Sequence, residues 1–163
     1  MMTFIICLAS TFTAFAPSNP YRDMTFNQIR AQEIREQMKE RRIEKLLKTI
    51  RIIESNERYD ARGGSGEYGA YQFMPATWDF YCYMFFGERL DITDPDNQDK
   101  VARAKIAQYV DKGYSNVDIS AIWNSGKPYG WQTKIGINRY GAKYNVPAYV
   151  NRFAMIYDNV IAL

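Results

Sequence analysis

Hydrophobic residues recur at steps of three and four in the middle of the chain, which is the spacing of one face of an α-helix. The clearest run lies between residues 43 and 54, where the apolar positions are Ile43, Leu46, Leu47, Ile50 and Ile53. The positions predicted to face solvent are Arg42, Lys45, Lys48, Thr49 and Arg51. Glu54 follows Ile50 by four residues. Its carboxyl group is therefore predicted to project from the apolar face, near the end of the helix.

A carboxyl group in that position is expected to hold its proton more tightly than an ordinary glutamate. Burial penalises the charged form, and the negative end of the helix dipole disfavours a carboxylate, so both raise the pKa. A glutamic acid that is still protonated near neutral pH can donate its proton to a leaving oxygen. Position alone nevertheless favours an ordinary glutamate at a fraying helix end, because structural carboxylates show similar shifts.

A glycine-rich segment follows and leads into a second helix. Its glycines permit positive backbone torsions or close backbone approach, and they are Gly63, Gly64, Gly66 and Gly69. Pro75 suits the first turn of a helix that is predicted to run to Phe86 and to stop at Gly87. Gln72 is a polar amide inside an apolar run, so a sugar amide or hydroxyl could supply its hydrogen-bond partners.

The rest of the chain is also predicted to be helical. Helices are expected from Asp94-Pro95 to near Gly113, over residues 116–123, and from Pro147 onward. The last helix has an apolar stripe formed by Tyr149, Phe153, Ile156, Tyr157 and Val160. Tyr149 therefore points inwards, where its hydroxyl either reaches the carboxyl group of Glu54 or simply packs. The segment 127–145 is expected to be a loop that roofs a groove, with Tyr129, Trp131, Lys134, Arg139 and Tyr140 in it.

Four short motifs occur in a fixed order along the chain. They are Glu54-Ser55, then Gly66, Gly69 and Gln72 before Pro75, then residues 121–126 (Ala-Ile-Trp-Asn-Ser-Gly), and finally Tyr149-Val150. In this order the chain resembles the lysozyme-like superfamily of soluble lytic transglycosylases and goose-type lysozymes, the transglycosylase SLT domain. It departs from that pattern at Trp123, where tyrosine is usual, at Ser125, where alanine is common, and at Glu67, where the family position is variable.

The resemblance implies a mainly α, lysozyme-like helical domain with a glycine-rich loop or small β-hairpin beside the cleft. It makes Glu54 the catalytic acid. The residues expected to bind or orient the substrate are Ser55, Glu67, Tyr71, Gln72, Trp123, Asn124 and Tyr149. No metal and no cofactor are expected.

The implied reaction is cleavage of the β-1,4 bond between N-acetylmuramic acid and N-acetylglucosamine in peptidoglycan. In a lytic transglycosylase one glutamate acts as acid and then as base, and the product is a 1,6-anhydromuramic acid. Two alternatives stay open. A hydrolytic muramidase would need Asp60 or Glu67 to place a water, whereas a catalytically idle glycan-binding or virion structural protein would keep only the fold.

Composition narrows the class of protein further. The 163 residues are 47% hydrophobic and 15% aromatic, which suffices for one well-packed domain. The net charge of +3 suits anionic cell-wall polymers or membranes, and no basic run is dense enough to predict nucleic-acid binding. Because the chain has no histidine, a Ser-His-Asp triad and a histidine-ligated zinc site are excluded. Cys82 is expected to be a buried structural thiol.

The first 42 residues differ from the rest. Residues 1–16 are apolar and end in Ala14-Phe15-Ala16, which predicts a signal peptide or an N-terminal anchor. Residues 17–42 are expected to form a linker and a charged helix, which either joins the next helix or stands apart as a stalk. Residues 43–163 would then be the lysozyme-like domain. The expected location is secreted, periplasmic or in the cell envelope. Membrane attachment through the N-terminus, and a virion or secretion-complex partner, are the associations considered.

Overall fold

The computed structural model describes residues 24–137, 141 and 143–161. The chain divides into two compact units, Met1–Ile34 and Arg35–Leu163. The predicted signal peptide or anchor at residues 1–16 lies outside the described residues. Within the described ranges, no helix is both long enough and apolar enough to cross a membrane.

The predicted fold class is confirmed, because the structure is mainly helical with one small antiparallel hairpin. The helices are α1 (Phe26–Ser55), α2 (Pro75–Phe86), α3 (Pro95–Asp111), α4 (Asn116–Ser125) and α5 (Val146–Asn159). The strands are β1 (Ile135–Ile137) and β2 (Lys143–Asn145), in which Gly136 lies opposite Tyr144. Of the two forms considered for the charged stretch before residue 43, the structure has the continuous one, since α1 is unbroken.

The described part of the first unit is the start of α1. Thr25 precedes the helix, and its backbone N–H and hydroxyl both donate hydrogen bonds to the side-chain oxygen of Gln28, at 2.7 and 2.9 Å. The backbone N–H of Gln28 donates to the Thr25 hydroxyl at 3.4 Å. This reciprocal pair satisfies two backbone donors that the first turn of a helix leaves free.

In the second unit, α2 and α3 begin at the prolines expected to start them, whereas α4 runs two residues beyond the expected range 116–123 and α5 begins one residue before the expected Pro147. Pro75 occupies the first turn of α2, and Gly87 closes it in a left-handed conformation with φ 74°. The Asp94 side chain accepts a hydrogen bond from the Asp96 backbone at the start of α3. Ser115 and Asp118 form a complete capping box at the start of α4, which ends at Gly126 with φ 77°.

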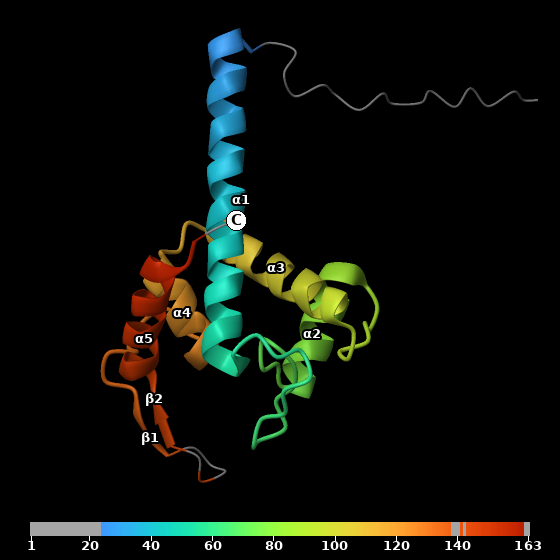
Figure 1. Ribbon diagram of the computed structural model, residues 1–163, viewed down its shortest axis with the longest axis vertical. Helices are drawn as coiled ribbons and strands as arrows, with labels where there is room; N and C mark the ends of the chain where they lie inside the picture. The colour runs from blue at the N-terminus through green and yellow to red at the C-terminus, as the bar shows by residue number, and fades with distance from the viewer. Residues whose placement is uncertain (1–23, 138–140, 142, 162–163) are drawn as a thin grey trace, which may run out of the picture. The chain divides into compact units, whose positions relative to one another are not determined.

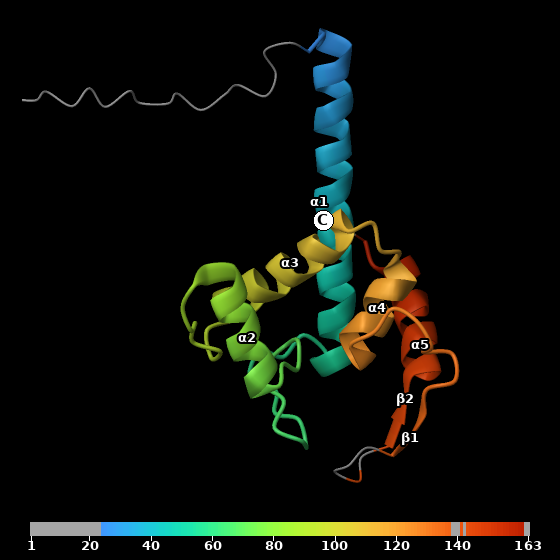
Figure 2. The same cartoon turned by 180° about the vertical axis from the view of Figure 1, so that it is seen from behind.

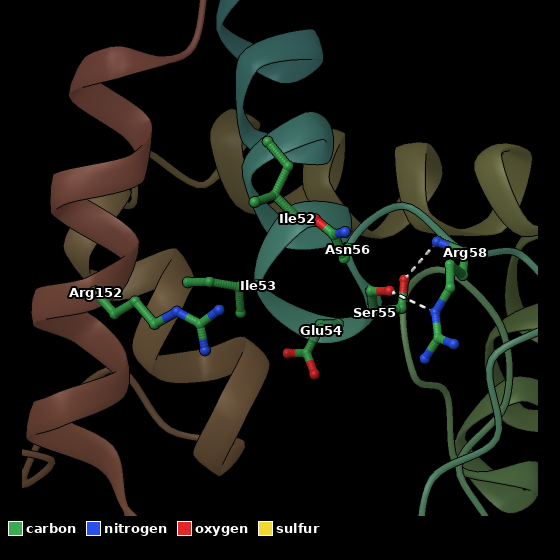
Figure 3. Close-up of a pocket in the computed structure, with 7 residues that line it drawn as sticks. All are labelled: Ile52, Ile53, Glu54, Ser55, Asn56, Arg58 and Arg152. Carbon is green, nitrogen blue, oxygen red and sulfur yellow. Dashed lines mark hydrogen bonds between the residues drawn. The ribbon is translucent and has the colours of Figure 1, made fainter.

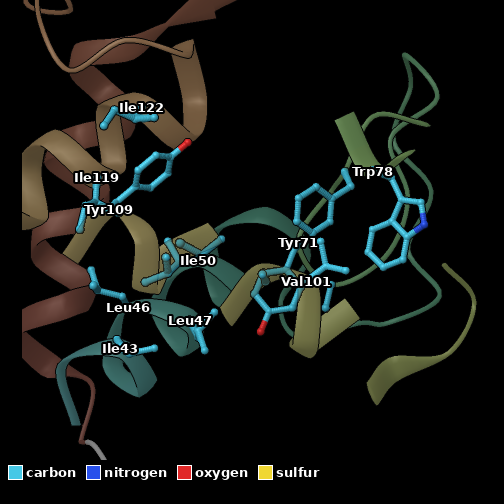
Figure 4. Close-up of a cluster of buried hydrophobic side chains, with 14 of the residues drawn as sticks. Ile43, Leu46, Leu47, Ile50, Tyr71, Trp78, Val101, Tyr109, Ile119 and Ile122 are labelled. Atoms are coloured by element: carbon cyan, nitrogen blue, oxygen red, sulfur yellow. The ribbon is translucent and has the colours of Figure 1, made fainter. Parts of the chain in front are cut away.

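Within the second unit, helices pack on both sides of the C-terminal half of α1. Helices α4 and α5 lie side by side on one side, and α2 and α3 lie on the other (Figure 1; Figure 2). Four residues of the apolar stripe of α1, namely Ile43, Leu46, Leu47 and Ile50, are buried as predicted and form the middle of the core (Figure 4), whereas Ile53 is half-buried at its edge. Its fully buried partners from the other elements include Tyr71, Trp78, Val101, Ile106, Ile119 and Phe153. Cys82 is a buried free thiol, as expected.

The predicted solvated face of α1 is not solvated: its four charged residues, Arg42, Lys45, Lys48 and Arg51, are half-buried, and Thr49 is buried. Thr49 is fully buried, and its hydroxyl donates to the Lys45 carbonyl at 2.7 Å. The Arg51 side chain is 16% exposed, and its guanidinium donates to the Tyr71 hydroxyl at 2.8 Å and contacts Asp99 at 3.2 Å. The reason is that neighbours cover α1 on two sides, so a single apolar stripe does not define all of its buried surface.

The segment 127–145 also differs from the loop that was expected. Residues 135–145 contain the β1–β2 hairpin, whose three-residue strands are too short for their alternation to be recognised in the sequence. Part of this segment does border a cavity, of about 450 Å³, where Lys134, Ile137 and Tyr144 face Asn124 and Ser125. Arg139 and Tyr140, which were expected in the roof, lie outside the described residues.

Candidate functional site

Glu54 lies in the last turn of α1, and its carboxyl group points away from the helix axis (Figure 3). The hydroxyl of Tyr149, in the first turn of α5, donates a hydrogen bond to Glu54 Oε1 at 2.7 Å. Two residues that are 95 positions apart in sequence, on two different helices, are therefore joined by this hydrogen bond. Of the two roles considered for Tyr149, the structure has the hydrogen bond.

The surroundings of Glu54 raise its pKa from 4.5 to about 7. Burial is the largest cause, since removal from water penalises the carboxylate form. The hydrogen bond from Tyr149 and the charge of Lys105 lower the pKa and only partly offset the burial. The charge of Glu67 raises it further. Glu54 is thus a carboxyl group with a large protonated population near neutral pH.

Glu54 borders two cavities. The first, of about 420 Å³, is here called the glycine-side cavity. Its lining consists of Glu54, Gly63, Gly64, Glu67, Gln72, Met74, Trp123 and Asn124. The second, of about 590 Å³, is called the arginine-side cavity (Figure 3). It is lined by Ile52, Ile53, Glu54, Ser55, Asn56, Arg58 and Arg152.

The glycine-side cavity brings together five of the residues singled out in the sequence: Glu54, Glu67, Gln72, Trp123 and Asn124. Its wall requires a glycine at position 63. A Cβ atom there would lie 2.3 Å from Glu67 Oε2 and 2.6 Å from Gln72 Oε1. The Gln72 amide nitrogen donates to the Gly69 carbonyl at 2.8 Å, and Gln72 itself has φ 50°. The Ser65 backbone N–H donates to Glu67 Oε2 at 2.9 Å.

Ser55 and Tyr71, which were also expected to bind or orient the substrate, do not line the glycine-side cavity. The Ser55 hydroxyl donates to the Ala70 carbonyl at 2.9 Å and accepts from the Arg58 backbone at 3.0 Å, which ties the end of α1 to the glycine-rich segment. Tyr71 is fully buried and lines neither of the two cavities that Glu54 borders. Its hydroxyl donates to Asp99 Oδ1 at 2.6 Å. Tyr71 therefore supports the site from within the fold, whereas Ser55 both lines the arginine-side cavity and fixes the backbone beside Glu54.

Comparison with known families matches residues 32–134, more than half of the 163 residues, to the Transglycosylase SLT domain. The chain belongs to this family. Neither the curated proteins nor the solved structures gave a match. The matched range of the SLT domain contains Glu54, Glu67, Gln72, Trp123 and Asn124, whereas Tyr149 lies beyond it. Membership gives the protein a transglycosylase-type function that acts on peptidoglycan.

Two cationic side chains near the site of this SLT domain, Arg152 and Lys105, were not predicted from the sequence. Arg152 lies one turn after Tyr149 on α5 and lines the arginine-side cavity (Figure 3). Lys105 is buried on α3 at 6% exposure. It lies at the helical spacing of the buried residues Val101, Ala102, Ile106 and Tyr109, so a charged residue on an apolar stripe was the signal that could have revealed it.

Proposed function

We propose that this SLT domain protein is a lytic transglycosylase. It would cut the β-1,4 bond between N-acetylmuramic acid and N-acetylglucosamine and leave a 1,6-anhydromuramic acid end. One observation carries the proposal: a largely enclosed carboxyl group, with a pKa of about 7 and a tyrosine hydroxyl on one oxygen, borders a cavity that is also lined by amide and aromatic side chains.

The first step uses Glu54 as an acid. Its proton passes to the glycosidic oxygen while the bond from that oxygen to the anomeric carbon breaks, which leaves a free 4-hydroxyl on the N-acetylglucosamine. A raised pKa suits this step, because the protonated form must be populated at the working pH. Tyr149 holds Oε1 of Glu54, so Oε2 is the oxygen without this bond.

The second step uses the carboxylate that the first step creates. Glu54 removes the proton from the 6-hydroxyl of the muramic acid, and that oxygen bonds to the anomeric carbon. Glu54 returns to its protonated form, and no water is consumed. A single carboxyl group therefore completes the cycle, as long as the 6-hydroxyl can approach it.

The neighbouring side chains suit the binding of a sugar. Trp123 is half-buried and packs against Phe73 with ring centroids 5.4 Å apart, so its ring is held rigidly at the wall of the cavity. Asn124 is exposed and lines the same cavity, where its amide can bind an acetamido or hydroxyl group. Ser55 and Tyr71 would act indirectly, by fixing the backbone around Glu54 and the floor beneath Trp123.

A hydrolytic muramidase is the second candidate, and Glu67 favours it. Glu67 is a second carboxylate in the glycine-side cavity and could position a water. Asp60 is the weaker candidate for positioning that water, because it is exposed and is not among the described residues that line the glycine-side or the arginine-side cavity. Against this role, Glu67 Oε2 already accepts a hydrogen bond from the Ser65 backbone, which favours a structural role for Glu67 in the glycine-rich segment.

The decisive experiment compares the wild-type chain with Glu54→Gln on purified peptidoglycan. Loss of a general acid should lower the rate of muropeptide release by about 10³-fold, within the range that such catalysis contributes. Glu57→Gln is the matched control, because Glu57 is exposed just after α1 and contacts Arg51 rather than the cavity. It should retain wild-type activity.

Mass spectrometry of the released fragments separates the candidates. Anhydro ends support the transglycosylase, whereas reducing ends that carry an added water would identify a muramidase. If Glu54→Gln were as active as the wild type, Glu54 would not be the acid. A wild-type chain that binds glycan strands but releases nothing would be the idle binding protein.

We also propose that the protein is secreted, periplasmic or part of the cell envelope, where peptidoglycan is accessible. Anchoring to a membrane and inclusion in a virion are two particular forms of this location.

A further inference from the structure

Lys105 is a buried cation enclosed by aromatic rings. It lies on α3 at 6% exposure. Its Nζ atom is 3.9 Å from the ring centroid of Trp123, 4.8 Å from that of Tyr81 and 5.5 Å from that of Phe73. Ring faces attract an ammonium group but provide no oxygen to accept its protons.

The charge of Lys105 has no partner among the described residues. No hydrogen bond or ion pair joins its ammonium group to any of them, whereas surface lysines such as Lys39 pair with a carboxylate. Burial lowers the pKa of Lys105 to about 8, and the charge of Glu54 only partly offsets that effect. An ammonium group held in this way would be stabilised by an anion that reached it.

A third cavity gives access to this group. It measures about 540 Å³, and Lys105 is part of its wall; it is called here the lysine cavity. It shares Met74, Trp123 and Asn124 with the glycine-side cavity, so the two adjoin along one wall. Among the described residues that line it, none is acidic. A ligand in the glycine-side cavity can therefore extend a substituent past Asn124 towards a cation that no lining carboxylate neutralises.

The lysine cavity also offers a hydroxyl proton. The hydroxyl groups of Tyr81 and Tyr109 lie 3.1 Å apart and both residues line the cavity. Only one of the two protons is used in their mutual hydrogen bond, so the other is left to donate to a ligand. Burial raises the pKa of Tyr109, which keeps this hydroxyl neutral. An ammonium group and a neutral hydroxyl donor suit a carboxylate better than any neutral group.

We propose that the lysine cavity binds a carboxylate, namely one carried by the lactyl ether substituent of a muramoyl sugar, or by a peptide attached to it, while the sugar ring occupies the glycine-side cavity. This inference rests on the proposed function, since it names a further contact of the same substrate. Two sources share the chemistry: the lactyl carboxylate of a muramic acid without peptide, and a carboxylate of the attached stem peptide.

The test measures binding in the Glu54→Gln background, which keeps the ligand intact and removes the charge of Glu54 from the comparison. Three tetrasaccharide probes are titrated by calorimetry: an N-acetylglucosamine tetramer, a muramoyl tetramer with free lactyl groups, and a muramoyl tetramer with stem peptides. Adding Lys105→Met should weaken binding of a carboxylate-bearing probe about tenfold or more, the scale of one charged hydrogen bond. Binding of the uncharged tetramer should not change.

Lys100→Met is the matched control. Lys100 lies on the same helix, with its Nζ 4.5 Å from the ring centroid of Phe86, but it is exposed and does not line the lysine cavity. It should leave the affinities for all three probes unchanged. Tyr109→Phe, which removes one of the paired hydroxyls, should produce a smaller loss that is again confined to the carboxylate-bearing probes.

The outcomes identify the source or overturn the proposal. A loss confined to the free-lactyl probe assigns the lactyl carboxylate, and a loss confined to the peptide probe assigns the stem peptide. Equal losses for charged and uncharged probes, no loss for any, or no binding of a muramoyl probe while Lys105 is intact would overturn it. Cleavage does not enter these measurements, so an inactive wild-type chain would refute the proposed function without deciding this one.

Discussion

At the scale of single residues, the protonation of Glu54 is set by opposing influences. Burial raises the pKa of its carboxyl group, and the Tyr149 hydrogen bond and the charge of Lys105 lower it, with a result of about 7. If Glu54 donates the proton in the first step, the active form is the protonated one. The rate should then fall as the pH rises through about 7.

Tyr149→Phe removes one of the influences that lower this pKa. The pKa of Glu54 should therefore rise above that of the wild type, and the alkaline limb of the pH–rate profile should move to higher pH. The maximal rate should fall about tenfold or more, because the carboxyl group loses the hydrogen bond that orients it. Initial rates of muropeptide release between about pH 5 and pH 9 measure both effects.

Tyr157→Phe is the control for this substitution. Tyr157 lies two turns further along α5, with the Nζ of Lys45 4.5 Å from its ring centroid, and it does not contact Glu54. Its profile should match that of the wild type. An alkaline limb that stays in place in Tyr149→Phe would show that the hydrogen bond does not influence the titrating group.

The inward positions of Glu54 and Tyr149 could be predicted because helical periodicity places them on apolar faces. The burial of Lys105 and Arg51 could not be read in the same way, since charged residues on a helix normally lie in water. Their burial depends on which other elements cover the helix. Arg51 is held by Tyr71 and Asp99, from two segments distant in sequence, and periodicity within one helix carries no information on such contacts.

At the scale of elements, the glycine-rich segment depends on one close approach to α3. Gly69 has φ 83°, and a Cβ atom there would lie 2.1 Å from the side-chain oxygen of Gln98. Gln98 is fully buried and accepts from the Ala70 backbone at 2.7 Å, while its amide nitrogen donates to the carbonyls of Tyr59 and Ile92. One side chain thus joins three stretches of backbone, and Gly69 leaves room for it.

Comparing Gly69→Ala with Gly66→Ala separates the cost of backbone strain from the cost of displacing the Gln98 side chain. Both glycines have positive φ, but a Cβ at Gly66 would meet nothing within 4 Å. Gly66→Ala should cost about 1–2 kcal/mol of unfolding free energy, the cost of the backbone conformation alone. Gly69→Ala should cost about 3 kcal/mol or more, because Gln98 must also give up buried hydrogen bonds. Urea unfolding measures both, and equal costs would contradict the role assigned to Gln98.

Helix boundaries were the part of each element most open to prediction, because proline, glycine and capping side chains mark them locally. Both ends of α2 and α4, and the start of α3, follow such residues. The hairpin was not foreseen at residues 135–145, since its pairing of Ile135 with Asn145 joins strands of only three residues. The contact of Gln98 with the glycine-rich segment had no local signal either.

At the scale of the whole molecule, the raised pKa of Glu54 lowers the free energy of unfolding at neutral and alkaline pH. A carboxyl group whose folded-state pKa is raised from 4.5 to about 7 contributes stability at low pH, where both states are protonated. As the pH rises from about 4.5 through 7, the unfolded state releases its proton first, so that stability is lost. The loss reaches about 3 kcal/mol above pH 7, because each tenfold difference in proton affinity between the two states corresponds to about 1.36 kcal/mol.

Glu54→Gln removes this titration. The variant should be more stable than the wild type at pH 8, by up to about 3 kcal/mol, and the difference should vanish near pH 4. Thermal or urea unfolding at several pH values measures the difference. A constant offset between the two proteins from pH 4 to pH 8 would mean that the pKa of Glu54 is the same in the folded and unfolded states.

The bond between Glu54 and Tyr149 also has a consequence for the order in which the chain matures. Its partners are 95 residues apart, so Tyr149 is synthesised well after Glu54. A chain emerging from the ribosome contains α1 long before α5 exists, and until α5 packs the carboxyl group of Glu54 lacks the hydroxyl of Tyr149 and the charge of Arg152. The hydrogen-bonded pair proposed to act on the sugar is therefore assembled only when α5 meets α1. A chain that stopped before α5 would carry the glutamate without the tyrosine that orients it.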